Sequence, residues 1–356
     1  MHLRSLNLKL PNGKPKCVNN YYKSAILPID VSKGKTVLLS IQRDGRPIIP
    51  SCSCGNTGFV RAPTSERIVC RSCFSNDVSD KVRRAINRYR MFHEGDRIAV
   101  GLSGGKDSTV LLHILSQLQK AHPHSELAVI VVDEGIHGYR DEAIKFARLA
   151  AETANTQLHL VSFKELFGYT LDFLVSRTST HNYGQQPCSI CGKFRRQALN
   201  KAARAINATK LATGHNLDDE AQTCLLNMLR GDILRFRRLS RIPVQKHVLL
   251  VPRVKPLVEL TEREIQLYAL VREIRHYDVE CPYAPTAMRN DARNFLVVQE
   301  EKRPGTLKTI VRFHDRIMAQ ENQGSGSSRL ELCKKCGEPA SAAICSVCET
   351  LKELDL

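Results

Sequence analysis

Ser103-Gly104-Gly105-Lys106-Asp107-Ser108 is the stretch that decides the fold of this chain of 356 residues. It follows the apolar run 97–102, which predicts a strand, and it precedes residues 109–115, which predict a helix. A glycine-rich turn at a helix N-terminus presents free backbone N–H groups to an anion, and adjacent glycines let the backbone approach a phosphate closely. The stretch therefore predicts a nucleotide phosphate site.

The spacing of these six residues differs from the Walker motif, G-x-x-x-x-G-K-[ST]. They resemble the PP-loop of ATP pyrophosphatases, enzymes that cleave ATP between its α- and β-phosphates. The alternative is an ordinary turn in which Asp107 or Ser108 caps a helix. The match at all six positions, together with the strand–turn–helix context, favours the PP-loop.

Apolar runs alternate with helical stretches around this loop. Strands are expected at residues 98–102, 127–132, 158–162, 210–214 and 248–251, and helices at 78–92, 140–154 and 194–207. This alternation predicts an α/β fold with a doubly wound, mostly parallel sheet. Ligands bind at the carboxyl ends of such strands, and the Ser103 loop, Asp133 and Gly214 all follow strands there.

The composition points to an anionic partner. Lys and Arg outnumber Asp and Glu by 53 to 36, giving a formal net charge of +17, which favours nucleic acid. With no Trp and few other aromatic residues for base stacking, contacts to the backbone and shape of a folded RNA are favoured. The cations gather in two stretches, Lys81, Arg83, Arg84, Arg88 and Arg90, and Arg230, Arg235, Arg237, Arg238 and Arg241. The alternative for either stretch is a solvated helix face.

The chain shows no sign of a membrane or secretory segment. No apolar run reaches the length of a membrane span, and the first ten residues alternate polar and apolar side chains. We therefore expect a cytoplasmic protein without membrane association. In such a protein, 13 cysteines indicate metal or redox chemistry rather than disulfides.

Paired cysteines near the C-terminus predict a structural zinc site. Cys333-x-x-Cys336 is followed closely by Cys345-x-x-Cys348, the spacing of a four-cysteine zinc site. The module of residues 330–356 has too little apolar core to fold without a metal.

A second module, residues 49–76, carries a similar set of cysteines. Cys52-x-Cys54 is followed by Cys70-x-x-Cys73, and we expect these four to hold a second structural zinc. The C-x-C pair is tighter than the usual C-x-x-C, which makes Cys52 the least certain ligand of the set.

The remaining chain divides around these modules. Residues 1–48 form an N-terminal extension with no assignable chemistry, and residues 77–323 form the catalytic domain. Residues 324–329 are rich in Gly and Ser, as in a flexible linker.

Four further cysteines lie within the α/β region, and three of them stand out. Cys188 and Cys191 form a C-x-x-C pair before a basic helix, and Cys281 lies far along in Glu-Cys-Pro-Tyr. A positive helix N-terminus would favour thiolates at Cys188 and Cys191. The pair alone fits half of a zinc site, a redox dithiol or two of three iron–sulfur ligands. Cys224 stands among leucines and is expected to be a buried structural residue.

Taken together, these segments resemble the TtuA/TtcA-type tRNA 2-thiouridine synthetases, nearest the group of TtuA and the cytoplasmic tRNA 2-thiolation proteins. Beside the PP-loop, the matching segments are residues 187–196, 213–219, 227–232 and 280–283, in the family's order. The resemblance implies a PP-loop, adenine nucleotide alpha hydrolase-like fold flanked by the two zinc modules. It also implies that ATP adenylates the C2 oxygen of a tRNA uridine, that pyrophosphate leaves, and that a sulfur nucleophile then displaces AMP.

The same resemblance implies roles for the cysteines and for one carboxylate. In this family, cysteines matching Cys188, Cys191 and Cys281 hold a [4Fe-4S] cluster whose fourth iron has no protein ligand and can carry sulfide. An older interpretation makes one of them a persulfide carrier, and both interpretations stay open here. Cys188, Cys281 and Asp219 are the implied catalytic residues. Asp219 would act as an acid or base or hold Mg²⁺, and the alternative is a carboxylate that stabilises a helix N-terminus.

The resemblance also implies an ATP site. The loop would cradle the phosphates with Mg²⁺, Asp133 and Gly214 would approach the adenosine, and Arg195 would neutralise the α-phosphate. The full set of expected ATP-binding residues is Leu102, Ser103, Gly104, Gly105, Lys106, Asp107, Ser108, Asp133, Arg195 and Gly214.

Partners follow from the resemblance as well. It implies tRNA as substrate, a ubiquitin-like thiocarboxylate carrier as sulfur donor, and a homodimer. Enzymes acting at the wobble position and in the T-loop share these motifs, so both targets stay open. One alternative is another PP-loop tRNA-modifying enzyme, such as a lysidine synthetase-like ligase, which would not need the three cysteines together. Another is a non-enzymatic zinc and RNA-binding protein, against which the intact loop argues.

Overall fold

The protein is represented by a computed structural model with two compact units, Met1–Asp77 and Val78–Leu356. It describes residues 51–63, 67–122, 124–180, 186–237, 239, 241–243, 245, 247–284, 289–321 and 330–356, and four short strands before residue 50. The expected linker, residues 324–329, lies outside the described residues.

The first unit contains three two-stranded antiparallel pairs. These are β1 (Ile29–Asp30) with β2 (Lys35–Thr36), β3 (Ser40–Ile41) with β4 (Pro47–Ile48), and β5 (Val60–Arg61) with β6 (Ile68–Val69). Helix α1 (Arg71–Arg88) begins directly after Cys70.

Helix α1 begins earlier than the helix expected at residues 78–92. Its buried side chains Phe74, Val78, Val82 and Ala85 recur every three or four residues, so the apolar stripe of one helix already starts inside the cysteine module. The helix ends at Arg88, and Arg90 follows with a φ of 48°. The predicted helix is therefore present, but its bounds were wrong at both ends.

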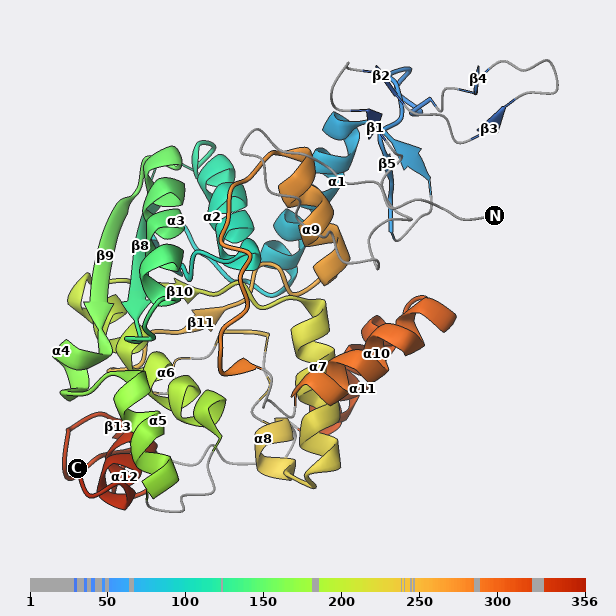
Figure 1. Cartoon of the computed structure of the whole chain (residues 1–356). Helices are drawn as coiled ribbons and strands as arrows, with labels where there is room; N and C mark the ends of the chain where they lie inside the picture. The colour runs from blue at the N-terminus through green and yellow to red at the C-terminus, as the bar shows by residue number, and fades with distance from the viewer. Residues whose placement is uncertain are drawn as a thin grey trace. The chain divides into compact units, whose positions relative to one another are not determined.

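The second unit is built on a five-stranded sheet in the order β11-β10-β7-β8-β9, in which every neighbouring pair is parallel (Figure 1). Its strands are β7 (Arg97–Gly101), β8 (Glu126–Asp133), β9 (Gln157–Ser162), β10 (Lys210–Ala212) and β11 (Arg253–Val254). The predicted α/β fold with a parallel sheet is confirmed, and four of the expected strands lie within two residues of their predicted bounds.

The fifth strand was predicted in the wrong place. Residues 248–250 form a turn rather than a strand, and β11 starts only at Arg253. The side chain of Asn200 donates to the carbonyl oxygen of Leu249 over 2.8 Å and accepts from the N–H of Val251 over 3.0 Å. The backbone of this apolar run is thus bonded to a helix side chain instead of to a neighbouring strand.

Helices cover both faces of the sheet. Successive side chains of β8 point to opposite faces, and Ile130 and Val132 share a core with Phe194 of α6 (Pro187–Ala205). On the other face, α2 (Lys106–Gln119) and α3 (Arg140–Thr153) contact β8 and each other. Helix α6 starts seven residues before the expected 194, with Pro187 in its first turn, so Cys188 and Cys191 lie inside the helix.

A second group of helices packs beside the sheet. Helices α7 (Leu217–Leu229), α10 (Arg289–Lys302) and α11 (Thr306–Glu321) contact one another and share a small apolar core (Figure 1). Elsewhere in this unit, α4 (Phe163–Phe167) and α5 (Leu171–Thr180) contact α6, α8 (Ile233–Arg237) contacts α7, and α9 (Glu262–Val271) packs on α2. Among the described helices, none has both the length and the apolar character needed to cross a bilayer.

The C-terminal cysteine module docks on α6. It consists of the hairpin β12 (Glu331–Leu332) and β13 (Pro339–Ala340) followed by α12 (Ser346–Glu353). Lys193 Nζ of α6 donates to Thr350 Oγ1 over 3.0 Å, and Arg204 Nη2 lies 2.6 Å from Glu338 Oε1. The module therefore stabilises the helix that also carries Cys188 and Cys191.

Candidate active site

The loop after β7 has the form expected of a phosphate cradle. Leu102 is buried in the core, and its N–H donates to the carbonyl oxygen of Ile130 over 2.9 Å. Helix α2 begins at Lys106, and its N-cap, Gly105, has extended backbone angles (φ −77°, ψ 166°). Because glycine has no side chain to accept from the first turn, the helix N-terminus is suited to an external anion.

The loop is held in one conformation by its neighbours. Gly104 has a φ of +88°, and a Cβ there would lie 2.1 Å from the carbonyl oxygen of Ala143. The hydroxyls of Ser103 and Ser108 are 3.0 Å apart, and the carbonyl of Gly104 accepts from the N–H of Tyr277 over 2.8 Å. The cradle is thus preformed, and only glycine fits at position 104.

The other residues expected near the nucleotide also lie at the carboxyl edge of the sheet. Asp133 ends β8, and its carboxylate accepts from the N–H of Gly135 over 2.8 Å. Gly214 follows β10, and a Cβ there would lie 3.0 Å from the backbone of Asp107 and Ser108. The structure therefore brings Gly214 against the start of α2, as adjacent parallel strands require.

A polar pocket of about 170 Å³ opens beside the loop. It is lined by Asp107, Asn216, Asp218, Asp219, Gln222, Glu262, Arg289, Asn290 and Arg293. These residues come from the N-terminal turns of α2, α7, α9 and α10 and from the N-cap of α7. Burial raises the pKa of Asp218 to about 6 and also raises the pKa of Asp107. Clustered carboxyls with raised pKa values are typical of functional sites.

Asp219 has structural partners as well as a place in this pocket. Its Oδ2 accepts from the N–H of Asn216 over 3.2 Å in a capping box, and its Oδ1 lies 3.0 Å from Arg289 Nη1. Asp219 therefore stabilises the N-terminus of α7, which was the alternative interpretation, and it also lines the pocket. A catalytic role stays a prediction.

Lys106 is held at the base of the loop by carboxylates. Its Nζ lies 3.2 Å from Glu262 Oε1 and 3.4 Å from Asp107 Oδ1. Glu262 also pairs with Arg293 at 2.6 Å. Sequence reasoning missed Glu262, Arg289 and Arg293, because they lie at least 150 residues after the loop and carry no local pattern of their own.

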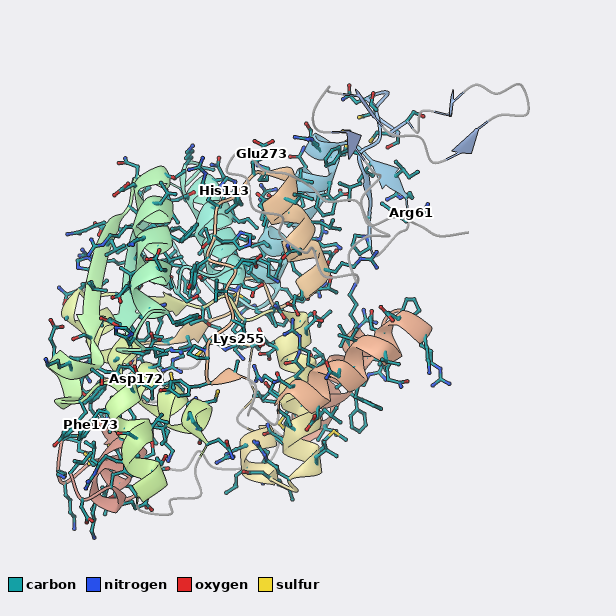
Figure 2. The ribbon with its side chains drawn as sticks, in the orientation of Figure 1. Arg61, His113, Asp172, Phe173, Lys255 and Glu273 are labelled. Carbon is teal, nitrogen blue, oxygen red and sulfur yellow. The ribbon has the colours of Figure 1, made fainter. Side chains whose placement is uncertain are left out.

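The three cysteines assigned to a cluster come from two segments that meet. Cys188 Sγ lies 3.5 Å from the carbonyl oxygen of Tyr283, two residues after Cys281. Cys281 packs against the same apolar core that contains Cys191. The hydroxyl of Tyr283 donates to Asp172 Oδ1 over 2.7 Å, and Asp172 lies on α5 (Figure 2). The segment bearing Cys281 is thereby anchored beside the N-terminus of α6.

These three cysteines differ from the two four-cysteine groups in number and in spacing. Among the described residues, only the two four-cysteine groups bring three or more metal-binding atoms within 4.8 Å of one another. Cys188, Cys191 and Cys281 are all free thiols and stand further apart. Cysteine thiolates are the ligands that iron–sulfur clusters take, so a set of three thiols from two adjacent segments fits this cofactor in its donor chemistry.

The expected thiolate character of Cys188 and Cys191 is wrong for the metal-free protein. Desolvation raises the pKa of both thiols, to about 11 for Cys191, and outweighs the nearby positive charge of Arg195. A bound metal would have to displace these protons.

Arg195 lies on the cysteine side of the site. Its Nη2 donates to Cys191 Sγ over 3.0 Å, and its Nε is 2.7 Å from Glu134 Oε1. Its expected role at the α-phosphate stays a prediction. Glu134 was missed by sequence reasoning, although it directly follows Asp133 at the end of β8.

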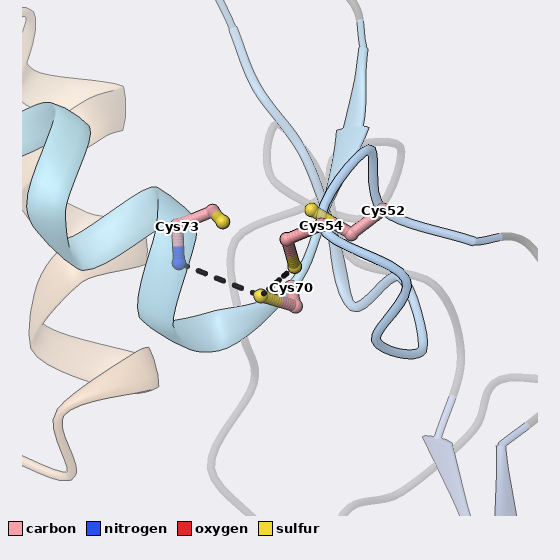
Figure 3. A group of neighbouring side chains, drawn as sticks. All are labelled: Cys52, Cys54, Cys70 and Cys73. Carbon is pink, nitrogen blue, oxygen red and sulfur yellow. Dashed lines mark hydrogen bonds between the residues drawn. The ribbon is translucent and has the colours of Figure 1, made fainter.

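The N-terminal cysteines form a compact four-thiol group. Cys52, Cys54, Cys70 and Cys73 come from the loop before β5 and from the start of α1 (Figure 3). Their sulfurs lie within 4.8 Å of one another, and those of Cys54 and Cys70 are 3.6 Å apart. A tetrahedral zinc with Zn–S bonds of about 2.3 Å would separate its sulfurs by about 3.8 Å. Cys52 belongs to this group despite the tight C-x-C spacing.

The C-terminal cysteines form a second group of the same kind. Cys333, Cys336, Cys345 and Cys348 also lie within 4.8 Å, with the sulfurs of Cys336 and Cys345 3.6 Å apart. All are free thiols, and Cys336 is the least buried of the four. Four protein ligands close the coordination of a tetrahedral metal, so both groups fit structural rather than catalytic sites.

The two basic stretches are partly used inside the protein. In the first, Lys81 pairs with Glu264, Arg83 Nη1 lies 2.6 Å from Asp80, and Arg88 Nη1 lies 2.5 Å from Glu259. In the second, Arg241 is buried and pairs with Asp315, and Arg235 pairs with Asp232. Only Lys81 and Arg241 are largely buried, while the side chains of Arg83, Arg88 and Arg235 are 58%, 61% and 63% exposed. Contact of the basic stretches with RNA stays a prediction. Arg238 lies outside the described residues.

Cys224 is 1% exposed, which confirms its structural interpretation.

Comparisons with known proteins agree with this geometry. The family model described as a PP-loop domain matches residues 75–300. The chain is 36% identical over 316 residues to cytoplasmic tRNA 2-thiolation protein 1 of Drosophila sechellia, covering 87% of this chain and 89% of the relative. The protein of the same name in Chlamydomonas reinhardtii is 38% identical over 298 residues, covering 83% of this chain and 82% of that relative.

One solved structure adds information on a cofactor. It is the U34-tRNA thiolase NcsA from Methanococcus maripaludis with its [4Fe-4S] cluster. It is 31% identical to this chain with a TM-score of 0.74, and the match covers 86% of this chain and 97% of NcsA. The similarity therefore spans nearly the whole of a thiolase that holds an iron–sulfur cluster.

Proposed function

Because the chain belongs to the PP-loop family, and within it to the group of the cytoplasmic tRNA 2-thiolation proteins, we propose that it converts a tRNA uridine to 2-thiouridine. It is a tRNA sulfurtransferase of the cytoplasm, the compartment that its relatives' name states. The likeness to a U34-tRNA thiolase favours uridine 34, the wobble position, over the T-loop.

The observation that supports this function is that a phosphate-binding loop and a set of cysteines lie close together at one edge of the sheet. The phosphate loop after β7 and the cysteines at the start of α6 are joined through Arg140, Glu134 and Arg195, and the segment of Cys281 packs beside them. An ATP pyrophosphatase without sulfur chemistry would have no use for this arrangement of thiols.

The loop would perform the activation half of the reaction. The N-terminus of α2 and the backbone from Ser103 to Ser108 bind the phosphates, while Gly214 leaves room for the nucleotide beside the loop. The uridine C2 oxygen attacks the α-phosphorus, the bond to the β-phosphate oxygen breaks, and pyrophosphate leaves. Asp107, Asp218 and Asp219 line the adjoining pocket, and one or two of these carboxylates, together with the phosphates, would bind Mg²⁺.

The cysteines would perform the sulfur-transfer half. Cys188, Cys191 and Cys281 would hold a [4Fe-4S] cluster, which when bound supplies an iron without a protein ligand where sulfide can be presented. Arg195 donates a hydrogen bond to Cys191 and so orients that side chain. The sulfur nucleophile would add to the C2 carbon of the adenylated uridine. The C2–O bond would then break, and AMP would leave with that oxygen.

We further propose the remaining cofactors and partners. Zinc occupies the two four-cysteine groups, whose sulfur spacing matches a tetrahedral ion of that size. A ubiquitin-like carrier with a C-terminal thiocarboxylate donates the sulfur, and the enzyme acts as a homodimer.

The test measures 2-thiouridine at position 34 by mass spectrometry of tRNA from a deletion strain complemented with variants. We expect Asp107→Ala and Cys281→Ala each to lower 2-thiouridine at least a hundredfold, with tRNA affinity unchanged for Asp107→Ala. Cys224→Ala is the matched control, because this cysteine is buried in α7 away from the three others. Full thiolation by Cys281→Ala, or by an iron-free preparation, would refute the cluster assignment.

A further inference from the structure

Glu134 is a buried carboxylate that takes part in neither chemical step of the proposed reaction. Its side chain is only 5% exposed and stands between two arginines. Its Oε2 lies 2.7 Å from Arg140 Nε, and its Oε1 lies 2.7 Å from Arg195 Nε. A buried carboxylate is tolerated when it is fully paired in this way, so removing it leaves two cations without their shared counterion.

The first arginine connects Glu134 to the phosphate loop. Arg140 Nη1 donates to the carbonyl oxygen of Ser103 over 2.7 Å, and its Nε donates to that of Val132 over 2.9 Å. The Arg140 side chain is 4% exposed, so these bonds are shielded from water. The position of the first residue of the loop thus depends on a guanidinium that has Glu134 as its counterion and that also bonds to the Val132 carbonyl.

The second arginine connects Glu134 to a predicted cluster ligand. Arg195 Nη2 donates to Cys191 Sγ over 3.0 Å. Hydrogen bonds to ligand sulfurs and nearby net charge set the reduction potential of an iron–sulfur cluster. The fork of one guanidinium holds the carboxylate and the sulfur at once, which a lysine could not reproduce.

We propose that Glu134 is a positioning residue that fixes the phosphate loop and the Cys191 sulfur relative to each other through Arg140 and Arg195. The two halves of the reaction must meet at one uridine carbon, and small misplacements of reacting groups cost large factors in rate. The inference rests on the proposed function only where it assigns a cluster to Cys191.

The variant that tests this is Glu134→Gln, which keeps the shape of the side chain and removes its charge. Glu220→Gln is the matched control. Glu220 is equally buried on α7, its Oε1 lies 2.6 Å from Lys255 Nζ, and its Oε2 lies 4.0 Å from Arg241 Nε. The control thus loses the same charge between two cations that bind neither the Ser103 carbonyl nor the Cys191 sulfur.

Two measurements are made on the full-length protein. The first is the affinity of the cluster-free protein for a non-hydrolysable ATP analogue, and we expect Glu134→Gln to weaken it about tenfold, or about 1.4 kcal/mol. The second is the midpoint potential of the reconstituted cluster, and we expect it to rise because the charge of Arg195 is no longer offset. Glu220→Gln should match the parent in both.

Parent-like values in both measurements would overturn the inference, as would a change in only one of them, since either result means that Glu134 does not join the two sites. If Glu134→Gln fails to fold, Arg195→Lys keeps the charge and tests the same connection, with the same two readouts expected to move. A parent protein that takes up no iron would refute the cluster assignment of the proposed function itself. An iron-bearing parent with an indifferent Glu134→Gln variant would refute this inference alone.

Discussion

Replacing Gly104 with alanine should damage the phosphate loop through two separate effects. The φ of +88° at this position costs an L-residue about 1–2 kcal/mol. The new Cβ would also lie 2.1 Å from the carbonyl oxygen of Ala143, which is backbone and cannot rotate away. Overpacking of this kind costs about 1–3 kcal/mol, so the sum is about 2–5 kcal/mol.

The assay is thermal unfolding together with binding of a non-hydrolysable ATP analogue. A loss of about 3 kcal/mol lowers the melting temperature of a domain of this size by roughly 6–12 °C. Because the loop must move to relieve the contact, analogue binding should fall with it. This drop in melting temperature is expected for the unit Val78–Leu356, which contains the sheet and the loop.

Gly105→Ala is the matched control for this prediction. Gly105 has a φ of −77°, and the nearest atom to an added Cβ is Ser103 Oγ at 3.5 Å. The free energy of unfolding of the Gly105→Ala variant should differ from that of the parent by less than about 1 kcal/mol. The reasoning is refuted if Gly104→Ala melts within about 2 °C of the parent and binds the analogue equally well.

Two further predictions concern the pocket and the cysteine groups. Burial raises the folded-state pKa of Asp218 from 3.8 to about 6, so its contribution to stability is complete below about pH 4 and is lost as the pH rises through 6. Denaturant titrations without nucleotide or divalent ions measure the free energy of unfolding of the parent and of Asp218→Asn. From pH 4 to pH 7 the parent should lose about 1–2 kcal/mol relative to the variant. A difference that stays constant over this range would contradict the prediction. Elemental analysis should find two zinc ions per chain, falling to one in both Cys345→Ser and Cys52→Ser. Cys345→Ser should also lower the melting temperature because its module packs on α6, and an unchanged zinc content would refute the assignment.

Much of the fold was predictable because it depends on local patterns. The apolar runs of β7 and β8, which are buried on both faces, directly predict strands of a covered parallel sheet, and the edge strand β9 follows from its alternating apolar residues. The run at 248–251 was equally apolar but is not a strand, because the side chain of Asn200 takes up its backbone groups. The start of α6 was missed because its first turn, Pro-Cys-Ser-Ile, carries little apolar periodicity.

The sequence by itself determined the phosphate loop and the two four-cysteine groups, whereas Cys188, Cys191 and Cys281 form a set only through the family resemblance. The loop and the two four-cysteine groups are short patterns whose chemistry depends on residue type and spacing. Only the tertiary structure decided that Glu134 lies between Arg140 and Arg195, and that Glu262 holds Lys106 at the base of the loop. Such ion pairs join side chains from different helices and strands, and their partners are chosen by how the sheet and helices pack rather than by any neighbour in the chain.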